Sequence, residues 1–258
     1  MGLKQSNLLK RGMDLLLTVS ALILLSPVLL GLCVLVRWRL GSPVLFRQVR
    51  PGLHERPITL YKFRTMTEER DADGKLLPDR QRLTPLGRML RNTSLDELPE
   101  LINVLKGDLS LVGPRPLLTH YLPWYRQHER LRHTVKPGLT GWAQIHGRNY
   151  LPWSKRLAMD VWYAENWSLV LDLKILLKTV ITVLRRKGVA ADTDVVETDL
   201  ALERGSDAED TDGNLPYKRE INPNNEGNCR ILERRGEVAV EMTISERSGF
   251  DISRGGHD

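Results

Sequence analysis

The sequence predicts an α+β protein with an N-terminal membrane helix, a small mixed α/β body and an acidic C-terminal tail. Three observations support this: an uncharged apolar run near the N-terminus, short strand and helix patterns across residues 41–189, and a change of charge beyond them. Residues 1–188 hold 30 Lys and Arg against 15 Asp and Glu, and residues 189–258 hold 8 against 17, so the net charges are +15 and −9. The 258-residue chain has two cysteines, which excludes a disulfide framework.

The apolar run covers 22 residues from Leu15 to Val36 and carries no charge. At about 1.5 Å per residue it is roughly 33 Å long, so one interpretation is a helix that spans the bilayer. Two features favour a re-entrant helix within residues 1–40 instead. Ser26-Pro27 interrupts the run at its middle, where proline removes a helix hydrogen bond and bends the helix. Basic residues also flank both ends, which argues that both ends are cytoplasmic; they are Lys4, Lys10 and Arg11 before the run and Arg37, Arg39, Arg47, Arg50 and Arg56 after it.

A β-hairpin is predicted next, from Pro43–Arg50 and the β-branched and aromatic segment ITLYKFRTM at residues 58–66, with a turn at Pro51-Gly52. Alternate side chains of a strand share a face, so Lys62 and Arg64 would project together. Two neighbouring cations form a candidate phosphate clamp. The alternative is a solvated strand face.

Residues 68–82 are polar and predict a loop, which contains Asp71 and Asp73. An Asp-x-Asp pair can hold the metal ion of a nucleotide-sugar glycosyltransferase. That motif normally ends an apolar strand, whereas here it follows charged residues, so an ordinary polar loop is the favoured interpretation.

The segment LTPLGRMLRNTSLDELPELINVL at residues 83–105 holds the densest chemistry. Pro99 has no backbone N–H and therefore suits the first turn of a helix, which predicts a helix start near Asp96. In one interpretation Asp96 caps that helix and Glu97 is a favourable first-turn acid. In the other, nearby arginines keep Asp96 ionised so that it can attack phosphorus, as aspartate does in phosphorylated ATPases.

Two further arginines are candidate phosphate ligands. Arg115 follows a short predicted strand and is held between two prolines, and Arg148 lies in a compact glycine-rich loop at residues 135–149. A final helix is predicted from Trp162 to Lys187, either packed in the core or lying in a membrane interface. The tail at residues 190–258 is predicted to be mostly disordered, with one short strand at residues 237–246.

Together these segments resemble the bacterial sugar transferases, and specifically the small monotopic polyprenyl-phosphate phosphoglycosyl transferases. The resemblance covers residues 8–188 and rests on Ser26-Pro27, YKFRTM, TSLDELPELINVLKGDLSLVGPRP, KPGLTGWAQIHGRN and ENWSLVLDLKILLKT. It implies a re-entrant helix broken at Ser26-Pro27 and a catalytic domain, residues 41–189, on the cytoplasmic face of the bacterial inner membrane.

The resemblance also implies a reaction. Asp96 would attack the β-phosphorus of a UDP-sugar and release UMP, and polyprenyl (undecaprenyl) phosphate would then take the phosphosugar, which is the first membrane step of surface glycan assembly. Mg²⁺ is the implied cofactor, with Asp96 as its ligand, and Glu97 would position groups or assist proton handling. The implied phosphate-binding residues are Lys62, Arg91, Arg115 and Arg148.

The implied partners are a UDP-sugar, polyprenyl phosphate and membrane lipid, with no nucleic acid. The identity of the sugar and homo-oligomer formation stay open. Two rival functions are a direct glycosyltransferase that uses Asp71 and Asp73 and a non-catalytic membrane scaffold.

Overall fold

The computed structural model describes residues 3–147 and 151–184, together with Leu200, Glu203, Arg204 and four strands between residues 217 and 253. The chain divides into two compact units. The first contains Met1–Leu117 and Arg126–Glu197, and the second contains Leu118–Tyr125 and Thr198–Asp258. The first unit holds the elements that position the predicted site.

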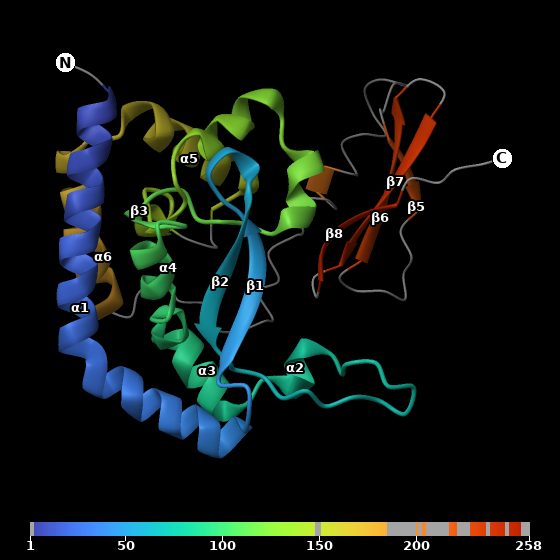
Figure 1. Ribbon diagram of the computed structural model, residues 1–258, viewed down its shortest axis with the longest axis horizontal. Coiled ribbons are helices and arrows are strands. Elements are labelled where there is room, and N and C mark those ends of the chain that lie inside the picture. Colours follow the sequence, from blue (N-terminus) through green and yellow to red (C-terminus); the bar gives the residue numbers. More distant parts are fainter. Residues whose placement is uncertain are drawn as a thin grey trace. The chain divides into compact units, whose positions relative to one another are not determined.

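Helix α1 (Leu3–Leu40) contains Pro27 and bends near its middle (Figure 1). The hydroxyl of Ser26 donates to the carbonyl oxygen of Ile23 at 2.8 Å, a local bond that favours bending. Within the described residues, α1 is the one helix long and apolar enough to cross a membrane. Its length and composition are compatible with a spanning helix as well as with a re-entrant one.

Both halves of α1 contact other elements of the first unit. In the first half, Lys10 forms an ion pair with Asp172 of α6 (Leu169–Leu184), and Arg11 donates to the carbonyl oxygen of Leu105 at 2.7 Å. The second half contributes to a buried apolar cluster formed by Leu32, Val36, Phe63 and Leu90. The two halves are therefore attached to the same body at different places.

The predicted hairpin is present. Strands β1 (Leu45–Pro51) and β2 (Pro57–Phe63) pair antiparallel, with Leu45 opposite Phe63 and Pro51 opposite Pro57. The one-turn helix η1 (Leu53–Glu55) closes the connection. Local alternation of residue types is sufficient to predict such a pair because both strands lie within one short stretch of chain.

Short helices follow the hairpin and lead to a two-stranded parallel sheet. They are α2 (Asp79–Arg82), α3 (Pro85–Asn92), η2 (Leu95–Glu97) and α4 (Glu100–Lys106). The sheet pairs β3 (Ser110–Val112) with β4 (Gly138–Thr140), and the chain around β4 forms η4 (Gln127–Thr134), η5 (Gln144–His146) and α5 (Trp153–Asn166). The predicted final helix is thus two helices, α5 and α6, because the backbone is extended at Trp167.

The main core lies where α4, β2, β3 and α6 meet. Its fully buried members include Leu60, Val104, Leu109, Val112 and Ile175. Ala21 and Leu22 of α1 pack against this cluster from outside. The core therefore connects α1 to the elements that hold the site.

The second unit contains η3 (Thr119–Trp124) and a four-stranded antiparallel sheet of order β5-β6-β7-β8. The strands are β5 (Tyr217–Glu220), β6 (Asn228–Arg235), β7 (Val238–Ser245) and β8 (Ser248–Ser253). The single strand predicted at residues 237–246 matches β7. The other three strands of this sheet were not predicted. Charged residues within β5 and β6 hide the alternation there. Disorder in the rest of the tail stays a prediction.

Candidate active site

The Asp-Glu pair lies in a tight connection between α3 and α4. The Thr84 hydroxyl caps α3 by accepting from the backbone N–H of Gly87 at 3.0 Å. After α3, Ser94 takes a left-handed conformation with φ of 55°, and residues 95–97 form the single turn η2. Helix α4 begins only at Glu100, so the predicted helix start near Asp96 was early by about one turn. The reason is that the chain makes tighter i→i+3 turns through Pro99, which has no N–H to donate.

Glu97 is the centre of a three-segment ion cluster. Lys62 of β2 donates to its Oε1 at 2.8 Å, and Arg115, from the turn after β3, donates to the same oxygen at 2.6 Å. Burial raises the pKa of Glu97, but the Arg115 and Lys62 charges and hydrogen bonds outweigh burial and hold that pKa below its usual range. Glu97 is therefore ionised at neutral pH and fixes two cations that lie far apart in the sequence.

Asp96 is 8% exposed and has a different environment from Glu97. Burial is the largest cause that raises its pKa, and the neighbouring Glu97 charge raises it further. Lys62, Arg91 and Arg115 lower it, but the net direction is upward. Among the described residues, no ion pair joins Asp96 to a cation. Two adjacent carboxyl groups with opposite pKa shifts are typical of catalytic sites.

Arg91 reaches the cluster from α3. Its Nε donates to the hydroxyl of Thr65 at 3.1 Å, and its charge acts on Asp96. The structure thus brings five of the predicted residues together: Lys62, Arg91, Asp96, Glu97 and Arg115. Arg148 lies outside the described residues.

A third carboxyl group, Glu100, was missed at the sequence level. It is 4% exposed, and its Oε1 lies 3.3 Å from Nζ of Lys62. Burial and the Glu97 charge raise the pKa of Glu100 to about 7, against the opposing effect of Lys62. The sequence did contain a signal for Glu100. It lies three residues after Glu97 in a segment predicted to be helical, and side chains at positions i and i+3 of a helix are neighbours.

Two buried groups support the cluster from behind. The side-chain amide of Asn103, on α4, donates to the carbonyl oxygen of Thr59 at 2.6 Å and accepts from the N–H of Tyr61 at 3.1 Å, which ties α4 to β2. The guanidinium of Arg132 donates to the carbonyl oxygen of Arg115 at 2.7 Å and to Asp160 of α5 at 2.7 Å. Side chains of Arg132 and Asp160 are 1% and 2% exposed, so this pair anchors the Arg115 turn inside the protein.

The predicted Lys62–Arg64 clamp does not form. Lys62 is paired with Glu97 and Glu100, whereas Arg64 donates to the carbonyl oxygen of Ser42 at 3.1 Å and lies 4.0 Å from Glu68. The two cations therefore have separate partners, although the N–H of Arg64 still donates to the carbonyl oxygen of Val44 in continuation of the strand pairing.

Asp71 and Asp73 lie in an exposed turn. Oδ1 of Asp71 accepts from the backbone N–H groups of Asp73 at 3.0 Å and Lys75 at 2.8 Å. An aspartate that caps its own turn matches the ordinary loop interpretation.

Carboxyl groups of the site are also candidate ligands for a divalent cation. In the part of the chain that the structure describes, no group of three or more His, Cys, Asp or Glu side chains is placed to hold a metal ion. Mg²⁺ takes oxygen ligands, however, and commonly uses one or two carboxylates together with substrate phosphates. Asp96 fits such a role, because no ion pair among the described residues occupies its carboxyl group.

Buried carboxyl groups among arginine and lysine side chains define a site whose cations suit phosphate-bearing substrates. The chain belongs to the bacterial sugar transferase family, whose model matches residues 5–186. It is therefore an enzyme of the sugar transferase class.

Three relatives illustrate the match. The chain is 59% identical over 182 residues to EpsL of Bacillus subtilis, an uncharacterized sugar transferase, covering 70% of this chain and 90% of that protein. It is 37% identical over 196 residues to the exopolysaccharide production protein ExoY of Sinorhizobium fredii, covering 69% and 87%. It is 42% identical over 185 residues to the UDP-glucose:undecaprenyl-phosphate glucose-1-phosphate transferase of Escherichia coli, covering 68% of this chain but only 40% of that longer protein.

Proposed function

We propose that this protein transfers a sugar 1-phosphate from a UDP-sugar to undecaprenyl phosphate and releases UMP. The observation that carries the proposal is the buried Asp96 beside a Glu97 that is fixed by Lys62 and Arg115, in a chain of this family. The Escherichia coli relative is named for the corresponding transfer from UDP-glucose, and ExoY is named for exopolysaccharide production. We accordingly assign the reaction to the first membrane step of surface glycan assembly.

The reaction has two displacements. In the first, a carboxylate oxygen of Asp96 forms a bond to the β-phosphorus of the donor, while the bond from that phosphorus to the bridging oxygen breaks and UMP leaves with the electron pair. In the second, a phosphate oxygen of the lipid bonds to the same phosphorus and Asp96 leaves as a carboxylate. One phosphoanhydride is broken and one is made, so no other energy source is needed.

Charge neutralisation is the main contribution of the surrounding side chains, as in other phosphoryl transfers. Lys62, Arg91 and Arg115 lie close enough to favour ionised Asp96 and to attract the diphosphate of the donor. Glu97 holds Lys62 and Arg115 in place through short charge-assisted hydrogen bonds. Asp96 itself is left without an ion-pair partner among the described residues, which suits a nucleophile.

Asp96 would hold Mg²⁺ together with phosphate oxygens of the donor. When bound, the ion supplies positive charge to the phosphates and favours the ionised form of the carboxyl group. This matters because burial and Glu97 together raise the pKa of Asp96 in the protein alone.

The contacts of α1 support a re-entrant helix. Lys10 and Arg11 in its first half, and Leu32 and Val36 in its second half, all contact the same unit. A helix that crossed the bilayer would carry its two ends to opposite sides, where one compact body could not bind both. Exposed apolar side chains on α1 and α6 provide a surface for lipid; they include Leu16, Ile23, Leu24, Leu30 and Val34 on α1 and Val170, Leu173, Leu177 and Val180 on α6. The site would then lie at the cytoplasmic face of the inner membrane.

The test is UMP release from a panel of UDP-sugars in the presence of undecaprenyl phosphate. The Asp96→Asn variant should lose UMP release while its membrane association is unchanged. Asp71→Asn is the matched control, because it alters an exposed loop carboxylate and should leave the rate unchanged.

Other outcomes decide between the rivals. Release of UDP in place of UMP, together with loss of activity in Asp71→Asn, would identify a direct glycosyltransferase. Absence of any nucleotide release, with membrane binding that depends on the basic residues, would identify a scaffold. Normal UMP release by Asp96→Asn would remove the nucleophile assignment.

A further inference from the structure

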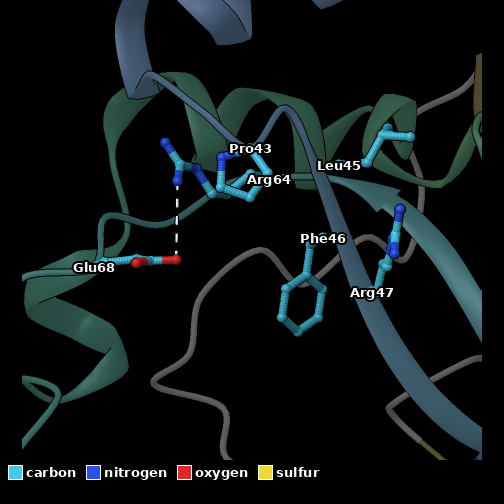
Figure 2. A pocket seen from close by; sticks show the side chains of 6 residues that line it. All are labelled: Pro43, Leu45, Phe46, Arg47, Arg64 and Glu68. Atoms are coloured by element: carbon cyan, nitrogen blue, oxygen red, sulfur yellow. Dashed lines mark ion pairs between the residues drawn. The ribbon is translucent and has the colours of Figure 1, made fainter. Parts of the chain in front are cut away.

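A pocket of about 470 Å³ opens where the chain leaves α1 and enters β1 (Figure 2). Three of its lining side chains are apolar and three are charged: Pro43, Leu45, Phe46, Arg47, Arg64 and Glu68. It begins only three residues after the end of α1 at Leu40. The pocket therefore lies next to the segment that we place in the membrane.

The pocket lies at the end of the hairpin whose strand β2 carries the active-site lysine, and its lining includes consecutive residues of β1, Leu45, Phe46 and Arg47. Phe46 lies directly opposite Lys62 in the strand register, and the N–H of Arg64 continues the ladder by donating to the carbonyl oxygen of Val44 at 2.9 Å. Opposed residues and alternate residues share a face, so Phe46, Lys62 and Arg64 fall on the same one. Lys62, two residues before Arg64, contacts Glu97 at 2.8 Å, so the pocket and the Asp-Glu pair adjoin the same strand.

Arg64 is a buried cation whose guanidinium is satisfied in part by the carbonyl oxygen of Ser42. The residue is 8% exposed, and its Nε is buried without a hydrogen-bond partner. Its nearest carboxylate, Glu68, lies 4.0 Å away and is 67% exposed, so that pair is loose. A buried, partly unsatisfied guanidinium is costly by itself but binds phosphate well, because its planar donors match phosphate oxygens.

We propose that this pocket receives the phosphate end of the lipid acceptor, with Arg64 facing the phosphate and Phe46 and Pro43 contacting the first apolar units of the chain. The proposal deepens the proposed function and rests on it. A polyprenyl phosphate keeps its tail in the bilayer, so its phosphate must approach the site from the membrane side. The pocket combines an apolar wall and a cation on that path, whereas the soluble donor needs no apolar wall.

The test compares two Michaelis constants of the full-length protein in zwitterionic vesicles that contain undecaprenyl phosphate. Arg64→Lys and Phe46→Ser should each raise the KM for undecaprenyl phosphate about tenfold, the effect of losing one charge-assisted hydrogen bond or one apolar contact. The KM for the UDP-sugar should not change. Phe46 is 47% exposed, so its replacement does not threaten folding. Arg70→Met, in the exposed loop outside the pocket, is the control and should change neither constant.

Glu68→Gln should change the KM for undecaprenyl phosphate in the opposite direction. Removing the one acidic side chain that lines the pocket should lower the KM for undecaprenyl phosphate, since a carboxylate repels the incoming phosphate. An unchanged acceptor KM in Arg64→Lys and Phe46→Ser, or an equal rise in both KM values, would overturn the proposal.

Two further experiments distinguish failure of the pocket assignment from failure of the proposed function. A photoreactive undecaprenyl phosphate without donor should label a peptide that contains residues 43–47 or 64–68, and labelling confined to other peptides would overturn the pocket even if UMP is formed. Failure of the wild type to release UMP from any UDP-sugar would instead refute the proposed function. If the variants lose binding to phosphatidylglycerol vesicles while the acceptor KM is unchanged, the pocket holds a phospholipid headgroup and the proposal is wrong.

Discussion

The buried carboxyl group of Glu100 should make the stability of this protein depend on pH. Burial and the Glu97 charge raise its pKa from 4.5 to about 7. The folded protein therefore binds the proton more tightly than the unfolded chain does. This contribution to stability is fully present below about pH 4.5 and is lost as pH rises through about 7. The difference between 4.5 and about 7, at about 1.4 kcal/mol per pH unit, corresponds to about 3–4 kcal/mol.

The Glu100→Gln variant removes the ionisation while keeping the shape of the side chain. Its free energy of unfolding, relative to that of the wild type, should rise by about 3 kcal/mol between pH 4.5 and pH 8. Urea unfolding of the detergent-solubilised protein, followed by tryptophan fluorescence at a series of pH values, measures this difference. Glu69→Gln, an exposed loop carboxyl group, is the matched control and should show no such trend.

A difference between Glu100→Gln and wild type that is the same at pH 5 and pH 8 would mean that Glu100 is ionised throughout this range. Lys62, which lies 3.3 Å from Glu100, would then compensate the buried charge in full.

Three other perturbations follow from particular contacts. Asp160→Ala removes the carboxylate that pairs with the fully buried Arg132 and should cost about 3–5 kcal/mol. Asp160→Asn should cost clearly less, and equal melting temperatures for the two variants would contradict this. Gly87→Ala places a Cβ atom 1.9 Å from the carbonyl oxygen of Thr65 and should lower the melting temperature, while Gly12→Ala, with nothing within 4 Å, should not. Cysteine introduced at Gln5 should react only with a membrane-permeant reagent, and labelling by an impermeant reagent from the periplasm would exclude the re-entrant arrangement.

Elements defined by neighbouring residues were predictable. Alternation in residues 43–50 and 58–66 was enough for the hairpin, because both strands and their turn lie in one stretch of chain. The effect of Pro27 on α1 follows from covalent structure, since proline lacks an N–H wherever it is placed. The start of α4 was less predictable, because a tight turn at Ser94 shifted the regular helix to Glu100.

The partners of the site residues were much harder to predict. Lys62 and Arg64 are two residues apart, yet one contacts Glu97 and the other the carbonyl oxygen of Ser42. The Arg132–Asp160 pair, which anchors the Arg115 turn, has no local signal because its members are distant in sequence and on different elements.

The amino-acid sequence by itself determined the bent apolar helix, the hairpin and the identity of the charged residues near Asp96. Only the tertiary structure decided which cation meets which carboxyl group, and hence why Asp96 and Glu97 differ in pKa. The physical reason is the distance along the chain over which each kind of interaction acts. Backbone geometry and turn chemistry act between neighbours along the chain, whereas burial and ion pairing depend on how separate segments pack.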